Sequence, residues 1–377
     1  MKQTPASIFH GGQLRQISER FAIPVEQLLD FSASINPMGS PASVLAAIRL
    51  GLESPGVLSS YPDLEELELK RCIAAAAHAD VNTIAVANGF VPLLEATLRT
   101  LSLRNCLLPV PCFGEYRRVL ENVGVAVTPY RLNPEDGFRY DQDQLIPALK
   151  TGQHDSILLA NPQNPTGALC ERALLIEIIK TAAQLNVHVL IDEAFIDYAI
   201  DQSVADQVSN FPGLTIFRSV TKFHAIPGLR VAYALGNQKH TKHLLRQLPP
   251  WPITALASLG VCAALKDTAY ASETLAGNTE RKRRLGFQLQ ELGLHVFPGA
   301  ANFLLLRLPS TVHAEELWQS LIVRNSIVMR DCSTFEMLPS GYLRSAVRAD
   351  KDNEKLVVAL KPLLSLSAIG ARSHRGC

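Results

Sequence analysis

The sequence predicts an α/β protein in which helices cover both faces of a mostly parallel central sheet, with a small α+β domain after it. From about residue 64 to 265, short apolar runs alternate with helix-like segments, and each run is followed by polar or glycine-containing residues. This alternation is typical of parallel strands joined by helices. Residues 280 to 377 instead mix helix and strand patterns without that regular order.

Four apolar runs predict strands of the large sheet: TIAVA (83–87), SILLA (156–160), VHVLID (187–192) and LTIF (214–217). They are followed by NGF, NPQNPTG, DEAF and RSVTK, in that order. Ligands of open α/β sheets bind outside the carboxyl ends of the strands. We therefore expect the chemistry to cluster in these four segments.

The C-terminal part predicts a helix at TERKRRLGFQLQEL, a strand in HVFPGAANFLLLRL, a helix from about residue 313, and strands at IVMRD and LRSAVR. The last residues, AIGARSHRGC, have the composition of a disordered tail. We expect a large domain over residues 46–265 and a small domain over residues 266–377. The N-terminal segment, residues 1–45, is expected to join the small domain.

Composition narrows the class of protein. The 36 basic and 35 acidic side chains nearly cancel, so there is no general electrostatic reason to bind nucleic acid or an anionic membrane, and an anion must be captured locally. The seven cysteines are odd in number and form no CxxC pair, as expected of reduced thiols. The N-terminus lacks the apolar core of a signal peptide, and no run approaches the ~20 apolar residues of a membrane span. We expect a cytoplasmic protein.

Candidate chemical groups follow the predicted strands. Asp192 ends an apolar strand, where a carboxylate is costly to bury without a positive partner, although Asp is also a common helix N-cap. The segment RSVTKFHAIPGLR brings two hydroxyls and a guanidinium near a lysine, which suits a phosphate ester held beside a reactive amine; an ordinary Ser/Thr turn is the alternative. These residues are Ser219, Thr221, Lys222 and Arg230.

The segment NPQNPTG (161–167) is rich in turn formers, so it could be a simple loop between strand and helix. In the functional interpretation, the Asn164 amide contacts a ring oxygen of a bound cofactor. The order of the signals favours the functional interpretation, because NPQNPTG, DEAF and RSVTK follow successive strands and share one sheet edge.

The series NPQNPTG, DEAF and SVTKFHAIPGLR resembles the signature of class I and II aminotransferases over nearly the whole chain. The resemblance implies the pyridoxal-phosphate-dependent fold type I, which is aspartate aminotransferase-like. It implies that Lys222 holds pyridoxal 5'-phosphate covalently and that Asp192 pairs with the pyridinium nitrogen. Such a pairing keeps the ring nitrogen protonated, which makes the ring an electron sink.

The same resemblance implies further contacts to the cofactor. Asn164 would lie at the ring 3-oxygen and Phe113 of PCFGEY would stack on the ring. Phe195 stands where many relatives have a tyrosine that bonds the 3-oxygen, so one ring contact is missing. Tyr61 of SYPD resembles a tyrosine that reaches the neighbouring subunit's site, which implies a homodimer with shared active sites. The cofactor phosphate would be held by Ser219, Thr221, Arg230 and the backbone amides of Gly89, Phe90 and Val91.

Two branches of the family fit: histidinol-phosphate aminotransferase and threonine-phosphate decarboxylase of cobalamin biosynthesis, both with phosphorylated substrates. HGGQLRQ, LLDFSASINPMG, DEAFIDY and TKFHAIPGLR resemble the decarboxylase more closely. That resemblance implies that His10 and Gly11 lie over the substrate phosphate, although the segment could also be a flexible turn. It implies that Arg330 and Arg344 bind the anionic groups of the substrate, with Arg348 as a weaker candidate. The alternative is that these are ordinary surface arginines on a strand.

Departures from the pattern leave the substrate open. Ser34 replaces the asparagine of FSANINP at a position expected to contact substrate, and Phe90 and Val91 replace polar residues beside the cofactor phosphate. Phosphoserine therefore remains an alternative to phosphothreonine. A non-catalytic regulatory domain is a third hypothesis, against which the intact Lys222 and Asp192 argue.

Overall fold

The large domain is built on a seven-stranded sheet. The computed structural model describes residues 10–373, with side chains up to residue 365. All strands of this sheet run parallel except β8, which pairs antiparallel with both neighbours, so the predicted fold class and all four predicted strands are confirmed. In spatial order the strands are β2 (Ile84–Asn88), β8 (Val231–Gly236), β7 (Leu214–Ser219), β6 (His188–Asp192), β5 (Ser156–Ala160), β3 (Asn105–Val110) and β4 (Ala126–Arg131).

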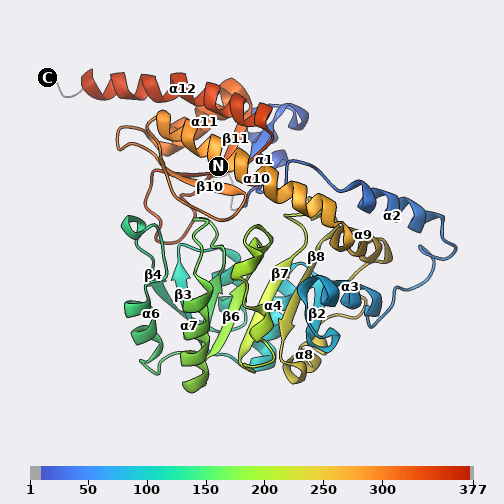
Figure 1. Cartoon of the computed structure of the whole chain (residues 1–377). Helices are drawn as coiled ribbons and strands as arrows, with labels where there is room; N and C mark the ends of the chain where they lie inside the picture. The colour runs from blue at the N-terminus through green and yellow to red at the C-terminus, as the bar shows by residue number, and fades with distance from the viewer. Residues whose placement is uncertain (1–9, 374–377) are drawn as a thin grey trace, which may run out of the picture.

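Helices cover both faces of this sheet (Figure 1). Successive strand residues point to opposite faces, and in β5 Ile157 and Leu159 join one apolar cluster while Leu158 joins the other. The first cluster includes side chains of α3 (Leu67–Ala77), α6 (Gln142–Leu149) and α7 (Arg172–Gln184). The second includes side chains of α4 (Phe90–Leu101), α5 (Glu115–Asn122) and α8 (Gln238–Leu245).

The small domain contains a five-stranded sheet, β1-β11-β12-β10-β9. The N-terminal segment contributes β1, which pairs parallel to β11. Helices α1 (Leu14–Phe21), α11 (Ala314–Asn325) and α12 (Asp350–Ser373) pack on this domain's own apolar core. The strands are β1 (Leu29–Phe31), β9 (His295–Val296), β10 (Phe303–Arg307), β11 (Ile327–Asp331) and β12 (Tyr342–Ala346).

The predicted disordered tail was wrong over part of its length. Helix α12 continues to Ser373, because a helix anchored by buried leucines such as Leu356 and Leu360 extends at little further cost per residue. Residues 374–377 lie outside the described part of the chain.

A long helix joins the domains. Helix α10 (Thr268–Glu291) runs for 24 residues; Leu285 and Leu289 pack into the small-domain core, while Tyr270 and Thr274 contact the segment between β1 and α2. Helix α2 (Ala42–Glu53) packs against α9 (Ala255–Lys266). None of the helices within residues 10–373 is long and apolar enough to cross a membrane.

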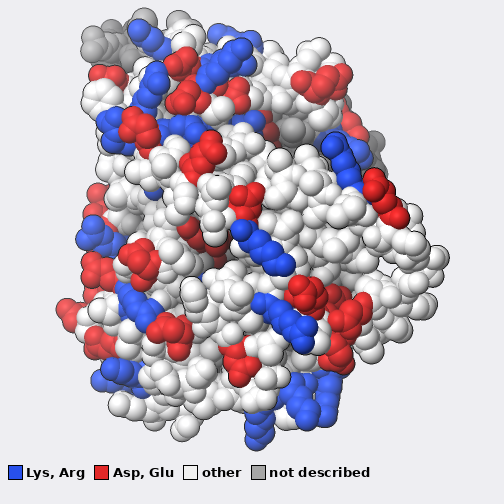
Figure 2. Space-filling view, turned by 45° about the vertical axis from the view of Figure 1, so that its right-hand side comes forward, with Lys and Arg blue, Asp and Glu red and all other residues white. Residues whose placement is uncertain are grey.

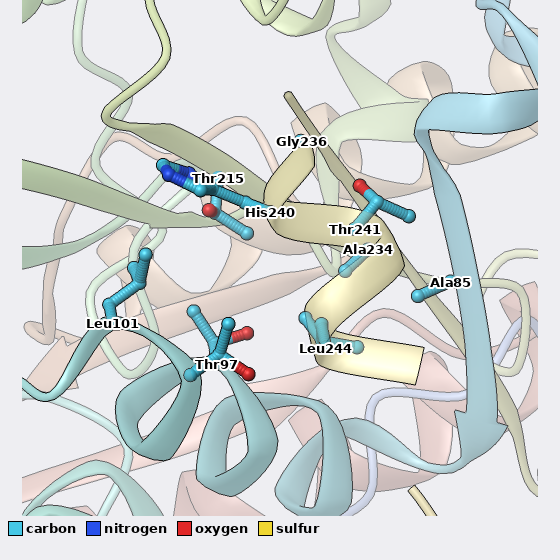
Figure 3. A pocket seen from close by; sticks show the side chains of 10 residues that line it. Ala85, Thr97, Leu101, Thr215, Ala234, Gly236, His240, Thr241 and Leu244 are labelled. Atoms are coloured by element: carbon cyan, nitrogen blue, oxygen red, sulfur yellow. The ribbon is translucent and has the colours of Figure 1, made fainter. Parts of the chain in front are cut away.

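A small cavity lies between the sheet, α4 and α8 (Figure 3). Its volume is about 10 Å³ and its lining includes Thr97, Thr215 and Thr241, so it has room for a single water molecule held by hydroxyls. Thr215 is the second residue of β7, which places the cavity at the amino end of the parallel strands. The polar segments singled out from the sequence lie at the other end.

Candidate active site

The candidate site forms where β5, β6 and β7 end. Asp192 is the last residue of β6 and only 7% exposed. Its Oδ2 accepts a hydrogen bond of 2.6 Å from the Tyr116 hydroxyl, and its Oδ1 accepts one of 2.9 Å from the Ala194 amide. Burial raises the pKa of the Asp192 carboxyl to about 6, although these two hydrogen bonds and the nearby charge of Lys222 lower it.

Lys222 lies three residues after the end of β7 and is half-buried. Its Nζ is 3.5 Å from Thr221 Oγ1, and its carbonyl accepts a hydrogen bond of 3.1 Å from the Asn36 amide. Burial, followed by the positive charges of Arg230 and Arg344, lowers the pKa of the Lys222 amine, while Asp192 raises it. The neutral, nucleophilic amine is therefore more populated than in an exposed lysine.

An anion-binding corner lies beside the lysine. The Ser219 and Thr221 hydroxyls are 2.7 Å apart. Gly89 caps the start of α4 with φ of 92° and ψ of 176°, and a Cβ atom there would lie 2.9 Å from Arg230 Nη2. The guanidinium thus stands next to a helix N-terminus, where backbone N–H groups favour anions.

The amides of this helix start are not equivalent. The Gly89 amide already donates to the Ala87 carbonyl at 2.8 Å. The donors that the first turn offers to an anion are therefore those of Phe90 and Val91, whose N–H groups have no acceptor within the helix.

Aromatic side chains form one wall of the site. The half-buried Phe113 ring meets the Tyr116 ring edge-on at 5.6 Å and lies 5.8 Å from the His10 ring. The Phe90 ring contacts Tyr116 at 5.6 Å. Phe195 is also buried, and the centroid of its ring lies 5.1 Å from that of the Phe303 ring.

Two buried arginines lie opposite each other on neighbouring strands of the small-domain sheet. Arg330 of β11 and Arg344 of β12 are paired residues in adjacent strands and are 5% and 6% exposed. Arg344 donates to Asn164 Oδ1 and, at 3.0 Å, to the Ser32 carbonyl, and Arg330 donates to Thr334 at 2.8 Å. Burial lowers the pKa of both guanidinium groups. Like charges placed opposite each other are destabilising, and a bound anion would offset that repulsion.

The HGG segment packs against the chain that follows β1. His10 Nε2 is 3.0 Å from Glu115 Oε1, and the Gly12 amide donates to Ser32 Oγ at 2.8 Å. A Cβ atom on Gly11 would lie 2.1 Å from the Ser32 carbonyl oxygen, so only glycine permits this close approach. Ser34 is 3% exposed, and its hydroxyl has no hydrogen-bond partner among the described residues.

Two candidates have partners outside the groups described so far. Tyr61, on the loop between α2 and α3, is 80% exposed and stacks at 4.5 Å on Trp251. The Arg348 guanidinium lies 3.5 Å from Asp352, one helical turn along the chain.

The sequence interpretation missed three residues that shape the site. Tyr116 follows Phe113 by three residues, which is one helical turn, and this spacing could have suggested that both reach the same place. Glu193 is fully buried, and its Oε2 accepts from Arg218 Nε at 2.8 Å, which ties the residue after Asp192 to strand β7. No pattern in the sequence indicated the pairing of Glu193 with Arg218.

Comparisons with known proteins find similarity over most of the chain. The family described as aminotransferase class I and II matches residues 26–363. A threonine-phosphate decarboxylase of Salmonella typhimurium is 34% identical over 94% of this chain and 96% of its own length, and an L-serine phosphate decarboxylase of Sulfurospirillum multivorans is 26% identical over 82% and 80%. The crystal structure of a histidinol-phosphate aminotransferase from Clostridium acetobutylicum matches with a TM-score of 0.83 and 31% identity, covering 90% of this chain and 99% of that one.

Proposed function

The chain belongs to the aminotransferase class I and II family, and on this premise we propose that it is a pyridoxal-phosphate-dependent decarboxylase of a phosphorylated amino acid. The substrate is O-phospho-L-threonine or O-phospho-L-serine. The products are CO2 and (R)-1-amino-2-propanol phosphate or ethanolamine phosphate, which would serve the cobalamin nucleotide loop. The decarboxylases among its relatives support this choice.

The residues present fit pyridoxal phosphate. The corner formed by the α4 N-terminus, the Ser219 and Thr221 hydroxyls and Arg230 offers charge and donors to a phosphate. Gly89 belongs to the same corner, because a Cβ atom there would lie 2.9 Å from Arg230 Nη2. A partly desolvated lysine and a buried carboxylate complete the set of groups that the cofactor needs.

When bound, pyridoxal phosphate supplies an electron sink for the negative charge that develops at the substrate Cα. Lys222, whose lowered pKa favours the neutral amine, would hold the cofactor and later deliver a proton to Cα. The Asp192 carboxylate would keep the ring nitrogen protonated, and the Phe113 ring would cover one face of the cofactor ring.

The single observation that carries the substrate assignment is the pair of buried arginines. Arg330 and Arg344 face each other on neighbouring strands, and a phosphorylated amino acid carries two anionic groups that guanidinium binds well. Arg344 also bonds Asn164, which links the arginine pair to the loop after β5. A substrate fixed at both anions can be oriented about Cα.

Orientation selects the reaction. The bond that breaks must stand perpendicular to the cofactor ring, where its electrons overlap the ring system. Arg330 and His10 would anchor the phosphate so that the bond to the carboxylate could take that position and CO2 would leave. Transamination requires the Cα proton to occupy it instead.

We further propose that two chains form a homodimer with shared sites. Figure 2 shows charges of both signs over most of this face and a largely uncharged area on its right. A cavity of about 490 Å³ lies among α2, α3 and α9. A second copy of this chain suits this region, where it would cover exposed apolar side chains and bring Tyr61 to the neighbouring site. These side chains include Leu50, Leu52, Leu58, Leu64, Leu67 and Leu259.

The dimer can be tested by size-exclusion chromatography with light scattering. Leu58→Glu places a charge on a side chain that is 77% exposed and should yield monomers. Val358→Glu, on an equally open surface of α12 (71% exposed), is the matched control and should remain dimeric. A monomeric unaltered protein would contradict the proposal.

Six cysteines in the described part of the chain are free thiols, all of them buried. Reduced thiols are typical of the cytoplasm, where we propose that the enzyme works.

The experiment that tests the function uses purified protein with pyridoxal phosphate and O-phospho-L-threonine or O-phospho-L-serine in separate reactions. CO2 release is followed in parallel with keto acid formation in the presence of 2-oxoglutarate. CO2 without keto acid would support the decarboxylase and rank the two substrates. Keto acid without CO2 would establish the aminotransferase alternative, which the similarity to the Clostridium acetobutylicum structure favours. Bound cofactor without turnover would favour a regulatory domain.

A further inference from the structure

Tyr116 makes a contact that the proposed reaction does not yet use. It lies in the first turn of α5 and is 2% exposed. Its hydroxyl donates to Asp192 Oδ2 at 2.6 Å, while the other carboxylate oxygen accepts the Ala194 amide. Its ring is held edge-on by the rings of Phe113 and Phe90, each 5.6 Å away. The phenol is therefore fixed both by packing and by its hydrogen bond.

The hydroxyl can only act as a donor here. Burial and the charge of Asp192 raise the pKa of Tyr116 well above its usual value, so the phenol is protonated at neutral pH. A donor to a carboxylate stabilises the ionised form and makes it a weaker base. A weaker base takes a proton less readily from a partner placed against it.

Other charged groups face Asp192 as well. Lys222 stabilises its negative charge, while Glu193 opposes it. Glu193 is itself paired with Arg218 and Ser203. Of the side chains whose contacts with the Asp192 carboxylate are described, Tyr116 is the one that forms a short hydrogen bond.

We propose that Tyr116 is a positioning residue that keeps Asp192 ionised and fixed in orientation, so that the proton stays on the ring nitrogen of the bound cofactor. The inference rests on the proposed function, because it assigns Asp192 to that nitrogen. Loss of the hydroxyl would move the proton toward Asp192 and weaken the electron sink.

Tyr140 provides a matched control. Its ring is also buried (7%), and its hydroxyl donates to the Ala160 carbonyl at 3.0 Å. Ala160 pairs with Asp192 across β5 and β6, so Tyr140→Phe removes one buried hydroxyl a single strand away without touching the carboxylate. Tyr116→Phe removes the hydroxyl that does touch it.

The test compares holoenzymes of the unaltered protein, Tyr116→Phe and Tyr140→Phe. The pH titration of the cofactor's ring nitrogen is followed without substrate by NMR of holoenzymes whose cofactor carries a nitrogen isotope label in the ring, and kcat and KM for CO2 release are measured separately. We expect Tyr116→Phe to lower the midpoint of the ring-nitrogen titration by at least about half a pH unit. We also expect it to lower kcat about tenfold or more with little change in KM. Tyr140→Phe should leave the midpoint and kcat unchanged.

Two further variants sharpen the outcome. If Tyr116 acts through Asp192, Tyr116→Phe should add little to Asp192→Asn in the double variant. Should Tyr116→Phe fail to fold, 3-fluorotyrosine at position 116 keeps the shape but is a stronger donor, and it should raise the midpoint instead. An unchanged midpoint in the 116 variants, or an equal change in Tyr140→Phe, would overturn the inference. A protein that retains no pyridoxal phosphate in any form would overturn the proposed function, and the inference with it.

Discussion

Replacing Asp192 by asparagine should stabilise the protein without its cofactor, although it removes a group that the proposed reaction needs. The Asp192 carboxyl is 7% exposed, and burial raises its pKa from 3.8 to about 6. Asparagine has nearly the same shape and can still accept the Ala194 amide. It avoids the cost of holding an ionised carboxylate in a buried place.

The size of the expected stabilisation follows from the difference between the folded and unfolded pKa values of Asp192. Because the folded pKa lies above the unfolded one, the protonated carboxyl favours the folded state; this advantage is fully present below pH 3.8 and is lost as the pH rises through about 6. A difference of about 2 pKa units corresponds to about 3 kcal/mol of unfolding free energy at neutral pH. Roughly half of that penalty develops between pH 5 and pH 7.5.

The assay is urea unfolding of the cofactor-free unaltered protein and Asp192→Asn at pH 5 and pH 7.5. The stability advantage of the variant should grow by about 1.4 kcal/mol between the two pH values. Asp201→Asn, which removes an exposed carboxylate, controls for the change in net charge. An advantage that is the same at both pH values would refute the reasoning, because Asp192 would then not titrate as a buried acid.

Three other substitutions test the site. Gly89→Ala should lower cofactor affinity at least about tenfold, as measured by absorbance titration, because the added Cβ meets Arg230. It should also lower the unfolding free energy by about 1–3 kcal/mol, because the backbone angles of Gly89 are open only to glycine. Arg344→Lys should raise KM for the phosphorylated amino acid about tenfold or more, since lysine has no planar fork that can donate to Asn164 and the Ser32 carbonyl while binding an anion. Glu193→Ala should lower unfolding free energy by about 3–5 kcal/mol in urea, because Arg218 stays buried without its partner.

Each of these three substitutions has a matched control variant. Gly228→Ala meets no atom within 4 Å and should retain normal cofactor affinity. Arg307→Lys alters a partly exposed arginine paired with Glu135 and should leave KM unchanged. Glu280→Ala breaks an exposed ion pair and should change stability far less than Glu193→Ala, as surface pairs contribute little. Equal effects in test and control variants would contradict the assigned contacts.

The amino-acid sequence identified the edge of the sheet at which the chemistry gathers. Apolar runs of strand length predicted β2, β5, β6 and β7, and the polar residues at or just after their ends include Asp192 and Lys222. The prediction succeeded because buried parallel strands are almost continuously apolar. The strands β3, β4 and β8 lie outside the four runs; β4 in particular is largely exposed, which removes the apolar signal.

Local patterns in the amino-acid sequence were enough to predict the fold class, the location of the chemistry at the strand ends, and the residue types available there. These follow from local patterns, since a strand and the loop after it are contiguous in the chain. Contacts between residues of different elements, in contrast, became visible only in the folded chain. The fold sets Tyr116 of α5 against Asp192 of β6 and places Arg330 opposite Arg344. Such pairs depend on strand register and helix packing, because a shift of a single residue in β12 would turn Arg344 to the other face of its sheet.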